Sequence, residues 1–268
     1  MGPMRRTLVS FHAHPDDEAI ATGGSLARAA EEGHRVVLVV ATRGEHGEVD
    51  DGFLDDGETL ADRRVQETEA AAEILGIERV VFLGYRDSGM AGTAENDLPG
   101  SFWTADLDEA SARLAAILEE EQAEVLTVYD DHGGYDHPDH IKVHRVGVRA
   151  AELAAVTRVY EATINRDHIR RLMLQLREEA GDTGIELPND MGDPDQLTIG
   201  VTEDRITTTV DVSPFVDAKR AALATHRSQV DETSFFLAMP PEQFRVAFGQ
   251  EWFIRRGTPP PIGDDWLF

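Results

Sequence analysis

The sequence predicts an α/β protein with a Rossmann-like, doubly wound and mostly parallel sheet that has helices on both faces. Short strand-like segments alternate with longer helical segments, in the order β-α-β-α-β-α-β-α, as far as residue 153. Residues 35–42 (RVVLVVAT) form a continuous β-branched run, which is typical of a strand buried on both faces of a parallel sheet. Polar clusters follow the first and the fourth predicted strand, where ligands bind in open α/β sheets.

Each predicted element follows from its local pattern of apolar residues, glycines and prolines. The predicted strands are residues 7–11, 35–42, 79–83, 125–129, 158–164, 196–201 and 206–212. The predicted helices are residues 19–30, 60–75, 107–121, 141–153, 167–180, 216–225 and 240–248. The segments 43–57, 84–102 and 181–195 are rich in glycine and polar residues and are predicted to be loops; binding residues could lie on the long 84–102 connection.

The chain divides into a regular and a less regular part. Residues 1–165 are predicted to form the Rossmann-like catalytic core that carries the metal site. Residues 166–268 are predicted to form a smaller, mixed C-terminal part that completes the substrate pocket. We do not expect this second part to fold independently.

Composition excludes several classes of site and partner. The chain has 268 residues and no cysteine, so a metal must be bound by His, Asp or Glu. Its formal charge of −26 argues against nucleic acid and against an anionic membrane surface as partners. The apolar runs are too short to cross a bilayer, and no apolar segment follows the arginines of residues 1–6, so we expect no signal peptide and a cytoplasmic protein.

The first polar cluster, residues 11–18 (FHAHPDDE), comes directly after the first predicted strand. Its histidines and carboxylates lie close together, and neighbouring carboxylates repel one another and raise each other's pKa. A divalent cation would remove this cost, because it neutralises carboxylates and accepts imidazole as a ligand. The cluster therefore indicates one half of a metal site.

The second polar cluster, residues 130–140 (DDHGGYDHPDH), follows the fourth predicted strand. It offers more ligands than one metal site can use, so some of its residues must do other work. Either cluster alone could be only a turn with a helix cap, since Asp17 or Asp139 could accept amide hydrogens at a helix start. Because both clusters contain His-Pro-Asp and both end strands of one predicted sheet, a shared functional site is favoured.

The residues 13–18 (AHPDDE), followed by 137–140 (HPDH), resemble the PIG-L/LmbE-like zinc-dependent N-deacetylases. These enzymes act on N-acetylglucosamine-type sugars and related amides. Residues 83–90 (LGYRDSGM) look like a loop of the mycothiol-pathway branch of that family, and residues 226–229 (HRSQ) look like its C-terminal motif.

The resemblance implies a metal site with the ligands His14, Asp17 and His140. They would hold one Zn²⁺ and leave a position open for water and substrate, with Fe²⁺ or another divalent ion left open. Asp16 would be the general base that takes a proton from the water. The ion lowers the pKa of water, so that no nucleophilic side chain is required.

The resemblance also implies roles around this metal site. His137, oriented by Asp139, would stabilise the oxyanion or assist departure of the amine, and Tyr135 would add a hydroxyl. The implied substrate-binding residues are Arg64, Asp87, Met90 and His226.

The predicted function is therefore a metal-dependent hydrolase that removes an acyl group from an N-acetylglucosamine-type or related amide. An amidase of a mycothiol-like thiol conjugate stays open, as does a non-haem iron enzyme with the same triad or a binding protein with a structural cation. A carboxylate next to a ligand, such as Asp16, is needed only for hydrolysis. The expected partner is a small N-acyl sugar or conjugate, and a homo-oligomer is left open.

Overall fold

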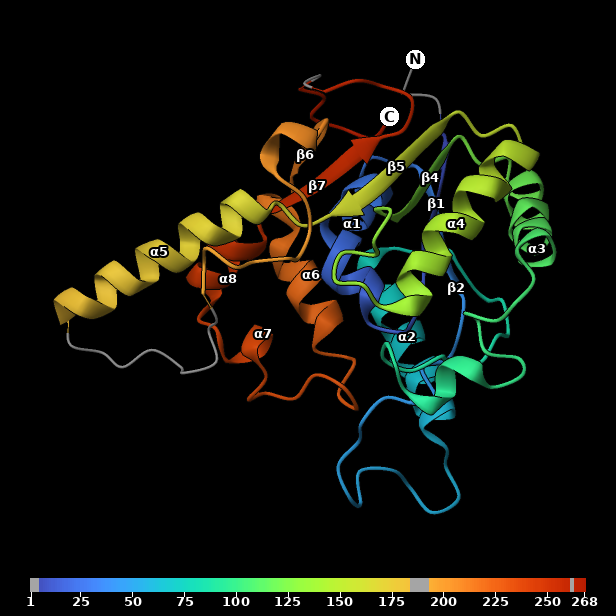
Figure 1. Ribbon diagram of the computed structural model, residues 1–268, viewed down its shortest axis with the longest axis horizontal. Coiled ribbons are helices and arrows are strands. Elements are labelled where there is room, and N and C mark those ends of the chain that lie inside the picture. The colour runs from blue at the N-terminus through green and yellow to red at the C-terminus, as the bar shows by residue number, and fades with distance from the viewer. Residues whose placement is uncertain (1–4, 184–192, 261–262) are drawn as a thin grey trace.

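A seven-stranded sheet runs through the computed structural model, which describes residues 5–183, 193–260 and 263–268 (Figure 1). The strands are β1 (Thr7–His12), β2 (Arg35–Val40), β3 (Arg79–Phe82), β4 (Val125–Tyr129), β5 (Arg158–Thr163), β6 (Thr208–Asp211) and β7 (Gln250–Arg255). Their order across the sheet is β3-β2-β1-β4-β5-β7-β6. The first five strands pair in parallel with one another, whereas β7 is antiparallel to both β5 and β6.

Helices connect the strands. They are α1 (Gly23–Glu31), α2 (Leu60–Leu75), α3 (Leu107–Glu120), α4 (Pro138–Leu153), α5 (Arg166–Thr183), α6 (Val216–Leu223), α7 (Phe235–Ala238) and α8 (Pro241–Phe248). A π-helical turn (Glu18–Thr22) precedes α1, and short 3-10 turns lie at Ala94–Asp97, Glu203–Arg205 and Ser213–Phe215. Across the described ranges, none of the helices combines the length and the apolar character needed to cross a membrane.

The sheet is buried on both faces, as residues 35–42 predicted. Val36, Leu38 and Val40 of β2 point into a core that also contains residues of α1, α2 and α6. Val37 and Val39 point into the opposite core, against α3 and α4, which Figure 1 shows together on one side of the sheet. The prediction of a doubly wound α/β fold is therefore confirmed.

One prediction about the C-terminal strands was wrong, and one strand was missed. Residues 196–201 do not form a strand, because the guanidinium of Arg166 binds the carbonyl oxygens of Ile199 and Gly200 in place of a neighbouring strand. Residues 250–255, for which we predicted no element, form β7, because their partners β5 and β6 lie far away in the sequence.

The C-terminal part is joined to the N-terminal part through the sheet and through a buried ion pair. Lys219 Nζ on α6 lies 2.6 Å from Glu251 Oε1 on β7, and both side chains are almost fully buried. The same Glu251 carboxylate accepts the backbone N–H groups of Gly24 and Ser25 at the start of α1, both at 2.9 Å. We still predict that residues 166–268 do not fold independently.

Candidate active site

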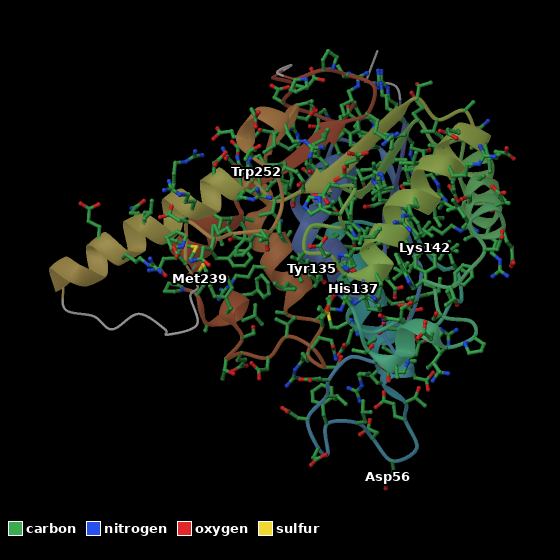
Figure 2. The ribbon with its side chains drawn as sticks, viewed as in Figure 1. Asp56, Tyr135, His137, Lys142, Met239 and Trp252 are labelled. Atoms are coloured by element: carbon green, nitrogen blue, oxygen red, sulfur yellow. The ribbon has the colours of Figure 1, made fainter. Side chains whose placement is uncertain are left out.

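The two polar clusters meet at one edge of the sheet. β1 and β4 are adjacent and parallel, so their carboxyl ends lie side by side, at the point where the strand order reverses. Residues 13–18 leave the end of β1, and residues 130–137 lead from β4 into α4. Figure 2 shows Tyr135 and His137 close together near the middle of the molecule, and their ring centroids are 6.1 Å apart.

His14, Asp17 and His140 are buried together, and the Asp17 carboxylate faces a nitrogen of each histidine. Asp17 Oδ2 lies 3.4 Å from His14 Nδ1 and 3.4 Å from His140 Nε2. Around a tetrahedral zinc ion with ligand distances of about 2.0–2.1 Å, neighbouring donor atoms lie about 3.3–3.4 Å apart. The spacing of the Asp17 carboxylate from each histidine therefore fits ligands of one ion of this size.

The remaining ring nitrogens of these histidines are already bound to protein oxygens. His14 Nε2 lies 3.3 Å from Asp139 Oδ2, and His140 Nδ1 lies 3.2 Å from the carbonyl oxygen of Gly133. A histidine that donates one ring N–H to an oxygen presents its other nitrogen as a lone pair, which is the arrangement of metal-bound histidines. This arrangement leaves His14 Nδ1 and His140 Nε2 for a cation.

The electrostatics of the cluster also call for a cation. Burial alone would raise the pKa of Asp17, but the neighbouring His140 and His14 hold it well below its usual range. Burial opposes a charge on His14, yet hydrogen bonds to Asp139, Asp17 and Asp87 raise its pKa well above the ordinary value. A bound divalent ion would supply the positive charge that these carboxylates otherwise draw from His14.

His137 lies beside the same donor atoms. Nitrogen atoms of His14, His137 and His140 lie within 4.8 Å of one another, so the described residues also offer a set of histidines to an ion. His137 is the N-cap of α4, and its Nδ1 accepts the backbone N–H of Asp139 at 3.1 Å. Burial, together with the nearby His14 and His140, lowers the pKa of His137 to about 4. A neutral His137 with Nδ1 as acceptor carries its proton on Nε2.

We expected Asp139 to orient His137, but its carboxylate does not contact His137. It accepts the backbone N–H of Ser88 at 2.9 Å and the Ser88 hydroxyl, and it contacts His14 Nε2. Only the backbone amide of Asp139 reaches His137. The reason is the start of α4, where the free amide of Asp139 binds the His137 ring and the side chain turns toward β1.

Asp16 lies next to His14, Asp17 and His140, which we call the donor set, and its backbone conformation is strained. Its φ is 99°, which is rare for a residue other than glycine. Its backbone N–H donates to Glu18 Oε2 at 3.0 Å, and its Oδ2 accepts from Arg64 Nη2 at 3.2 Å. Burial raises the pKa of Asp16 to about 6, although the Arg64 charge opposes the shift. The side chain is thus held beside the site by contacts other than those of Asp17.

Glu18 and His226 form a buried pair behind Asp16. His226 Nε2 lies 2.7 Å from Glu18 Oε1, and both side chains are fully buried. His226 was expected to bind substrate; the structure instead places its ring against Glu18, beneath the surface of the site.

The other residues expected to bind substrate are placed around the site in different ways. Arg64 is buried and donates to the carbonyl oxygens of Gly44 and Pro15 as well as to Asp16. Asp87 is buried, and its Oδ1 lies 3.5 Å from His14 Nε2. Met90 is 54% exposed. Tyr135 is 45% exposed, with its hydroxyl 3.4 Å from His140 Nε2.

Sequence reasoning missed two residues that support the site. Ser88 binds Asp139; it lies within the family-like stretch 83–90, but no role was assigned to it there. Tyr129, the last residue of β4, stacks on the His140 ring with centroids 4.3 Å apart, and its hydroxyl lies 2.8 Å from His12 Nδ1. An aromatic residue at the end of the strand that precedes the second cluster was a signal that could have found it.

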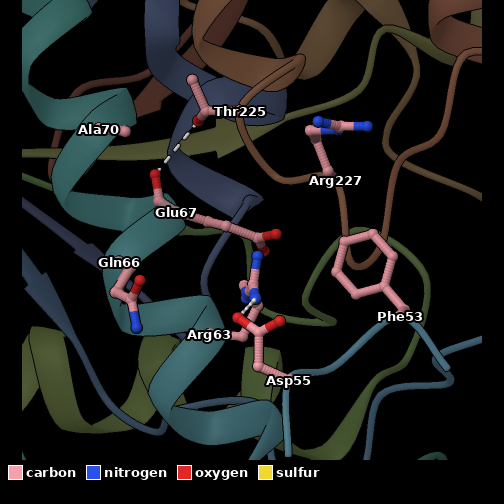
Figure 3. Close-up of a pocket in the computed structure, with 8 residues that line it drawn as sticks. All are labelled: Phe53, Asp55, Arg63, Gln66, Glu67, Ala70, Thr225 and Arg227. Atoms are coloured by element: carbon pink, nitrogen blue, oxygen red, sulfur yellow. Dashed lines mark hydrogen bonds and ion pairs between the residues drawn. The ribbon is translucent and has the colours of Figure 1, made fainter. Parts of the chain in front are cut away.

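Two hollows differ in their relation to the site. One of about 420 Å³ is lined by residues of α2 and by residues around Phe53 and Arg227, and Figure 3 shows Thr225 hydrogen-bonded to Glu67 in its wall. An apolar one of about 370 Å³ has Asp17 and His140 in its wall.

The fold and the site together define a class of protein. A buried set of histidines and a carboxylate, with a second carboxylate beside it that contacts an arginine, lies at the carboxyl edge of an α/β sheet. This is the arrangement of a metal-dependent hydrolase of the α/β class.

Comparisons with known proteins give the family. The model of the PIG-L family, described as GlcNAc-PI de-N-acetylase, matches residues 9–151. A 1D-myo-inositol 2-acetamido-2-deoxy-alpha-D-glucopyranoside deacetylase from Acidothermus cellulolyticus is 42% identical, and the match covers 97% of this chain and 92% of that protein. A protein of the same name from Streptomyces avermitilis is 40% identical over 95% of this chain and 94% of its own length. The chain belongs to the PIG-L family of deacetylases.

Solved structures of low identity share the fold. The N,N'-diacetylchitobiose deacetylase from Pyrococcus horikoshii has a TM-score of 0.60 at 22% identity, covering 93% of this chain and 83% of that one. A deacetylase of teicoplanin biosynthesis has a TM-score of 0.61 at 18% identity, covering 94% and 99%. The hydratase GalB from Pseudomonas putida has a TM-score of 0.59 at 21% identity, covering 94% and 97%, so the fold alone does not set the reaction.

Family membership confirms the prediction of an N-deacetylase that acts on an N-acetylglucosamine-type amide. Deacetylases of this family are metal-dependent, and the described residues contain a His/Asp site suited to a metal. The alternatives, a thiol-conjugate amidase or a non-haem iron enzyme, gain no support from the comparisons.

Proposed function

We propose that the chain is a zinc-dependent deacetylase of 1D-myo-inositol 2-acetamido-2-deoxy-α-D-glucopyranoside. The substrate is proposed from relatives of that name that are about 40% identical over nearly the whole chain. The observation that carries the chemistry is the contrast between two adjacent aspartates. Asp17 faces two histidines at the spacing of metal ligands, while Asp16 faces Arg64.

His14, Asp17 and His140 would hold the ion. The contact of Asp17 with both histidines favours this set over the one that contains His137, whose Nδ1 is already an acceptor. When bound, the ion polarises the acetyl carbonyl and makes water a stronger acid. Fe²⁺ or another divalent ion would find the same ligands.

Asp16 would act as the general base. A pKa near 6 leaves its carboxylate ionised at neutral pH while keeping it a stronger base than an ordinary aspartate. Arg64 and Glu18 fix its position, through the carboxylate and the backbone N–H respectively. The proton that Asp16 accepts from water is then available for the departing amine.

His137 and Tyr135 would bind the oxygen of the substrate carbonyl as it gains charge. His137 carries its proton on Nε2 because Nδ1 accepts from the backbone, so a neutral ring can donate without first being protonated. The Tyr135 hydroxyl lies beside His140. Although the residue as a whole is partly exposed, desolvation of the hydroxyl and the nearby Asp17 and Asp16 carboxylates raise its pKa above the ordinary value, so it also stays a donor. Asp139 would act by orienting His14.

The sugar is proposed to lie on the β2–β3 side of the donor set. Arg64 on α2 and Asp87 and Met90 after β3 come from elements on that side of β1. His226 would contribute through Glu18, which holds the Asp16 backbone. A cytoplasmic location and a homo-oligomer stay predictions.

The substitution Asp16→Asn tests this proposal. We expect the variant to retain its bound metal and to lose hydrolysis of the proposed substrate by about 10²-fold or more, because the base is lost while the ligands stay. Acetate release and metal content measure the two effects. Asp56→Asn is the matched control, since Asp56 lies exposed at the tip of the 43–57 loop (Figure 2). Full activity of Asp16→Asn would refute the role of Asp16, and loss of metal would make Asp16 a ligand.

A further inference from the structure

The apolar cavity beside the donor set is far larger than an acetyl group requires. Its volume is about 370 Å³, which is in the range of sites for whole small ligands. Asp17, Tyr135 and His140 form part of its wall. The rest comes mainly from apolar side chains of the C-terminal part and the end of β5, including Ile164, Ile169, Ile199, Phe236, Ala247, Phe248 and Trp252.

The charged residues in the wall of this cavity are already paired. Lys219 and Glu251 neutralise one another at 2.6 Å, and Asp17 and His140 belong to the donor set. A sugar placed in the cavity would leave many of its hydroxyl groups without hydrogen-bond partners, and each such group costs about 1–3 kcal/mol. An apolar group has no hydrogen bonds to lose on entering the cavity.

Most of the cavity wall lies on the opposite side of the metal ligands from the proposed sugar site. Arg64 and Asp87 come from the β2–β3 side of β1, whereas most of the wall comes from β5, β7, α8 and their neighbours, beyond β4 in the sheet order. Ile20, Ala21 and Lys219 complete the wall. Figure 2 shows Trp252, in the wall of the cavity, on the other side of Tyr135 from Asp56. An amide has only two ends, and if the sugar lies on one side of the ion, the acyl group lies on the other.

The mouth of the cavity carries an exposed aromatic side chain. Phe235, the first residue of α7, is 70% exposed although it belongs to the wall. Its ring lies edge-on to Phe236 with centroids 5.6 Å apart, and Phe236 packs on Phe248. Because the exposed Phe235 ring continues the apolar wall, it offers an apolar surface on which an apolar chain could pack.

We propose that this cavity is an acyl subsite, and that the enzyme hydrolyses N-acyl amino sugars with chains of about four to eight carbons in addition to the acetyl group. The proposal rests on the proposed function, because it assumes that the amide lies at the donor set. The chemistry is the same for each chain. The oxygen of water bonds to the acyl carbon, the C–N bond breaks, and the products are the free amine and a carboxylic acid, with the proton of water passing to the nitrogen.

A chain-length series tests the subsite. Acid release is measured from the same amino sugar carrying acetyl, butyryl, hexanoyl or octanoyl on its nitrogen. Burial of each added methylene is worth about 0.8 kcal/mol, so kcat/KM is expected to rise by up to about threefold to fourfold per methylene until the cavity is full. A steady fall of kcat/KM beyond acetyl, by about tenfold or more at octanoyl, would overturn the proposal while leaving the deacetylase intact.

Two neighbouring residues of α8 provide a matched pair of variants. Ala247 lines the cavity, whereas Val246 is 63% exposed and lies outside it. We expect Ala247→Phe to fill the space and lower the octanoyl-to-acetyl ratio of kcat/KM by about tenfold or more. Val246→Phe adds the same ring on the outside and should leave this ratio unchanged. Equal ratios in the two variants would contradict the proposal.

A variant at an exposed residue avoids misfolding, and a binding measurement tests the cavity without needing hydrolysis. Phe235→Ala removes an exposed ring and should raise KM for the octanoyl substrate about twofold to threefold, with little change for acetyl. Calorimetric titration with octanamide and acetamide tests the cavity without catalysis. Octanamide should bind more tightly, and Ala247→Phe should abolish the difference; equal binding of both amides would overturn the proposal even if no substrate were hydrolysed.

The cavity could instead hold an apolar group attached to C1 of the sugar, and a second substrate tests this alternative. If octyl 2-acetamido-2-deoxyglucopyranoside, and not the octanoyl amide, shows the gain that Ala247→Phe removes, the cavity holds an aglycone and the acyl proposal fails. If no amide is hydrolysed at all, the proposed function fails and the hydrolysis of longer acyl chains fails with it. Tighter binding of octanamide that Ala247→Phe abolishes would then show only that the cavity takes an acyl chain.

Discussion

Asp16 and Asp17 are neighbours in the chain, yet their carboxylates face opposite surroundings. Asp17 Oδ2 lies 3.4 Å from a nitrogen of each of two histidines, and Asp16 Oδ2 lies 3.2 Å from Arg64 Nη2. Their pKa values shift in opposite directions. Burial raises that of Asp16 to about 6, while the histidines hold that of Asp17 well below its usual range against the effect of burial. The positive φ of Asp16 turns the backbone so that adjacent side chains can differ in this way.

Metal binding should stabilise the protein through Asp17. An ion that binds only the folded state at 100 times its Kd adds about 2.7 kcal/mol to the free energy of unfolding, so addition of Zn²⁺ to chelator-treated protein should raise Tm by several degrees. Asp17→Asn should remove most of this rise, and Asp56→Asn should keep it. Differential scanning fluorimetry measures Tm with and without Zn²⁺. An equal rise in the Tm of Asp17→Asn would rule out Asp17 as a ligand.

The Glu18–His226 pair should act on turnover through Asp16. Glu18→Ala removes the acceptor of the Asp16 N–H and leaves His226 buried and unpaired, so we expect kcat to fall about 10- to 100-fold with metal content unchanged. Stability should fall by about 3 kcal/mol, because one partner of a buried pair is lost. Glu18→Gln keeps an acceptor oxygen and should restore part of kcat. Steady-state kinetics and urea unfolding measure both effects; an unchanged kcat in Glu18→Ala would remove the positioning role.

Tyr129 should tune metal affinity from behind His140. Tyr129→Leu removes both the ring that stacks on His140 and the hydroxyl that binds His12, and we expect the Kd for Zn²⁺ to rise about 10-fold. Tyr129→Phe keeps the stacking and should have a smaller effect. Tyr85→Phe is the control, because the Tyr85 hydroxyl is buried without a hydrogen-bond partner among the described residues. Competition with a chelator measures the series, and a Tyr129→Leu value equal to that of Tyr85→Phe would contradict this role.

The ion pairs of Glu121 should make stability depend on pH. Hydrogen bonds from Arg35, and then from Arg79, hold the pKa of Glu121 below its ordinary value of 4.5, against the effect of burial. Because the folded-state pKa is the lower one, this stabilisation is present above about pH 4.5 and is lost as pH falls through the folded-state value. Glu121→Gln should therefore lower the free energy of unfolding by about 1 kcal/mol at pH 7, since the arginines are partly exposed, and by less near pH 3. Urea unfolding at both pH values measures this; a loss that is equal at pH 3 would contradict it.

The sequence predicted the site better than its supporting contacts. Residues 13–18 and 137–140 could be placed at one sheet edge because strand alternation and the position of β1 beside β4 follow from general rules of α/β folds. The partner of Asp139 could not be predicted in the same way. Ser88 lies on an irregular loop, and the choice between His137 and His14 depends on the direction of the first turn of α4.

The C-terminal part shows the same limit. β7 pairs in antiparallel fashion with β5 and β6, and its short run carries no alternation that would reveal such distant partners. The burial of His226 depends on Glu18 more than two hundred residues away, so a motif could mark His226 as functional without indicating its contact.

Anomalous X-ray diffraction at the zinc edge, on crystals of the zinc-loaded protein, tests the metal site most directly. We predict one peak in the described part of the chain, bound by His14 Nδ1, Asp17 Oδ2 and His140 Nε2 at about 2.0–2.2 Å, with Asp16 outside the ligand shell. A peak bound by Asp16, or by His137 in place of Asp17, or no peak at this sheet edge, would contradict the division of roles between the two aspartates.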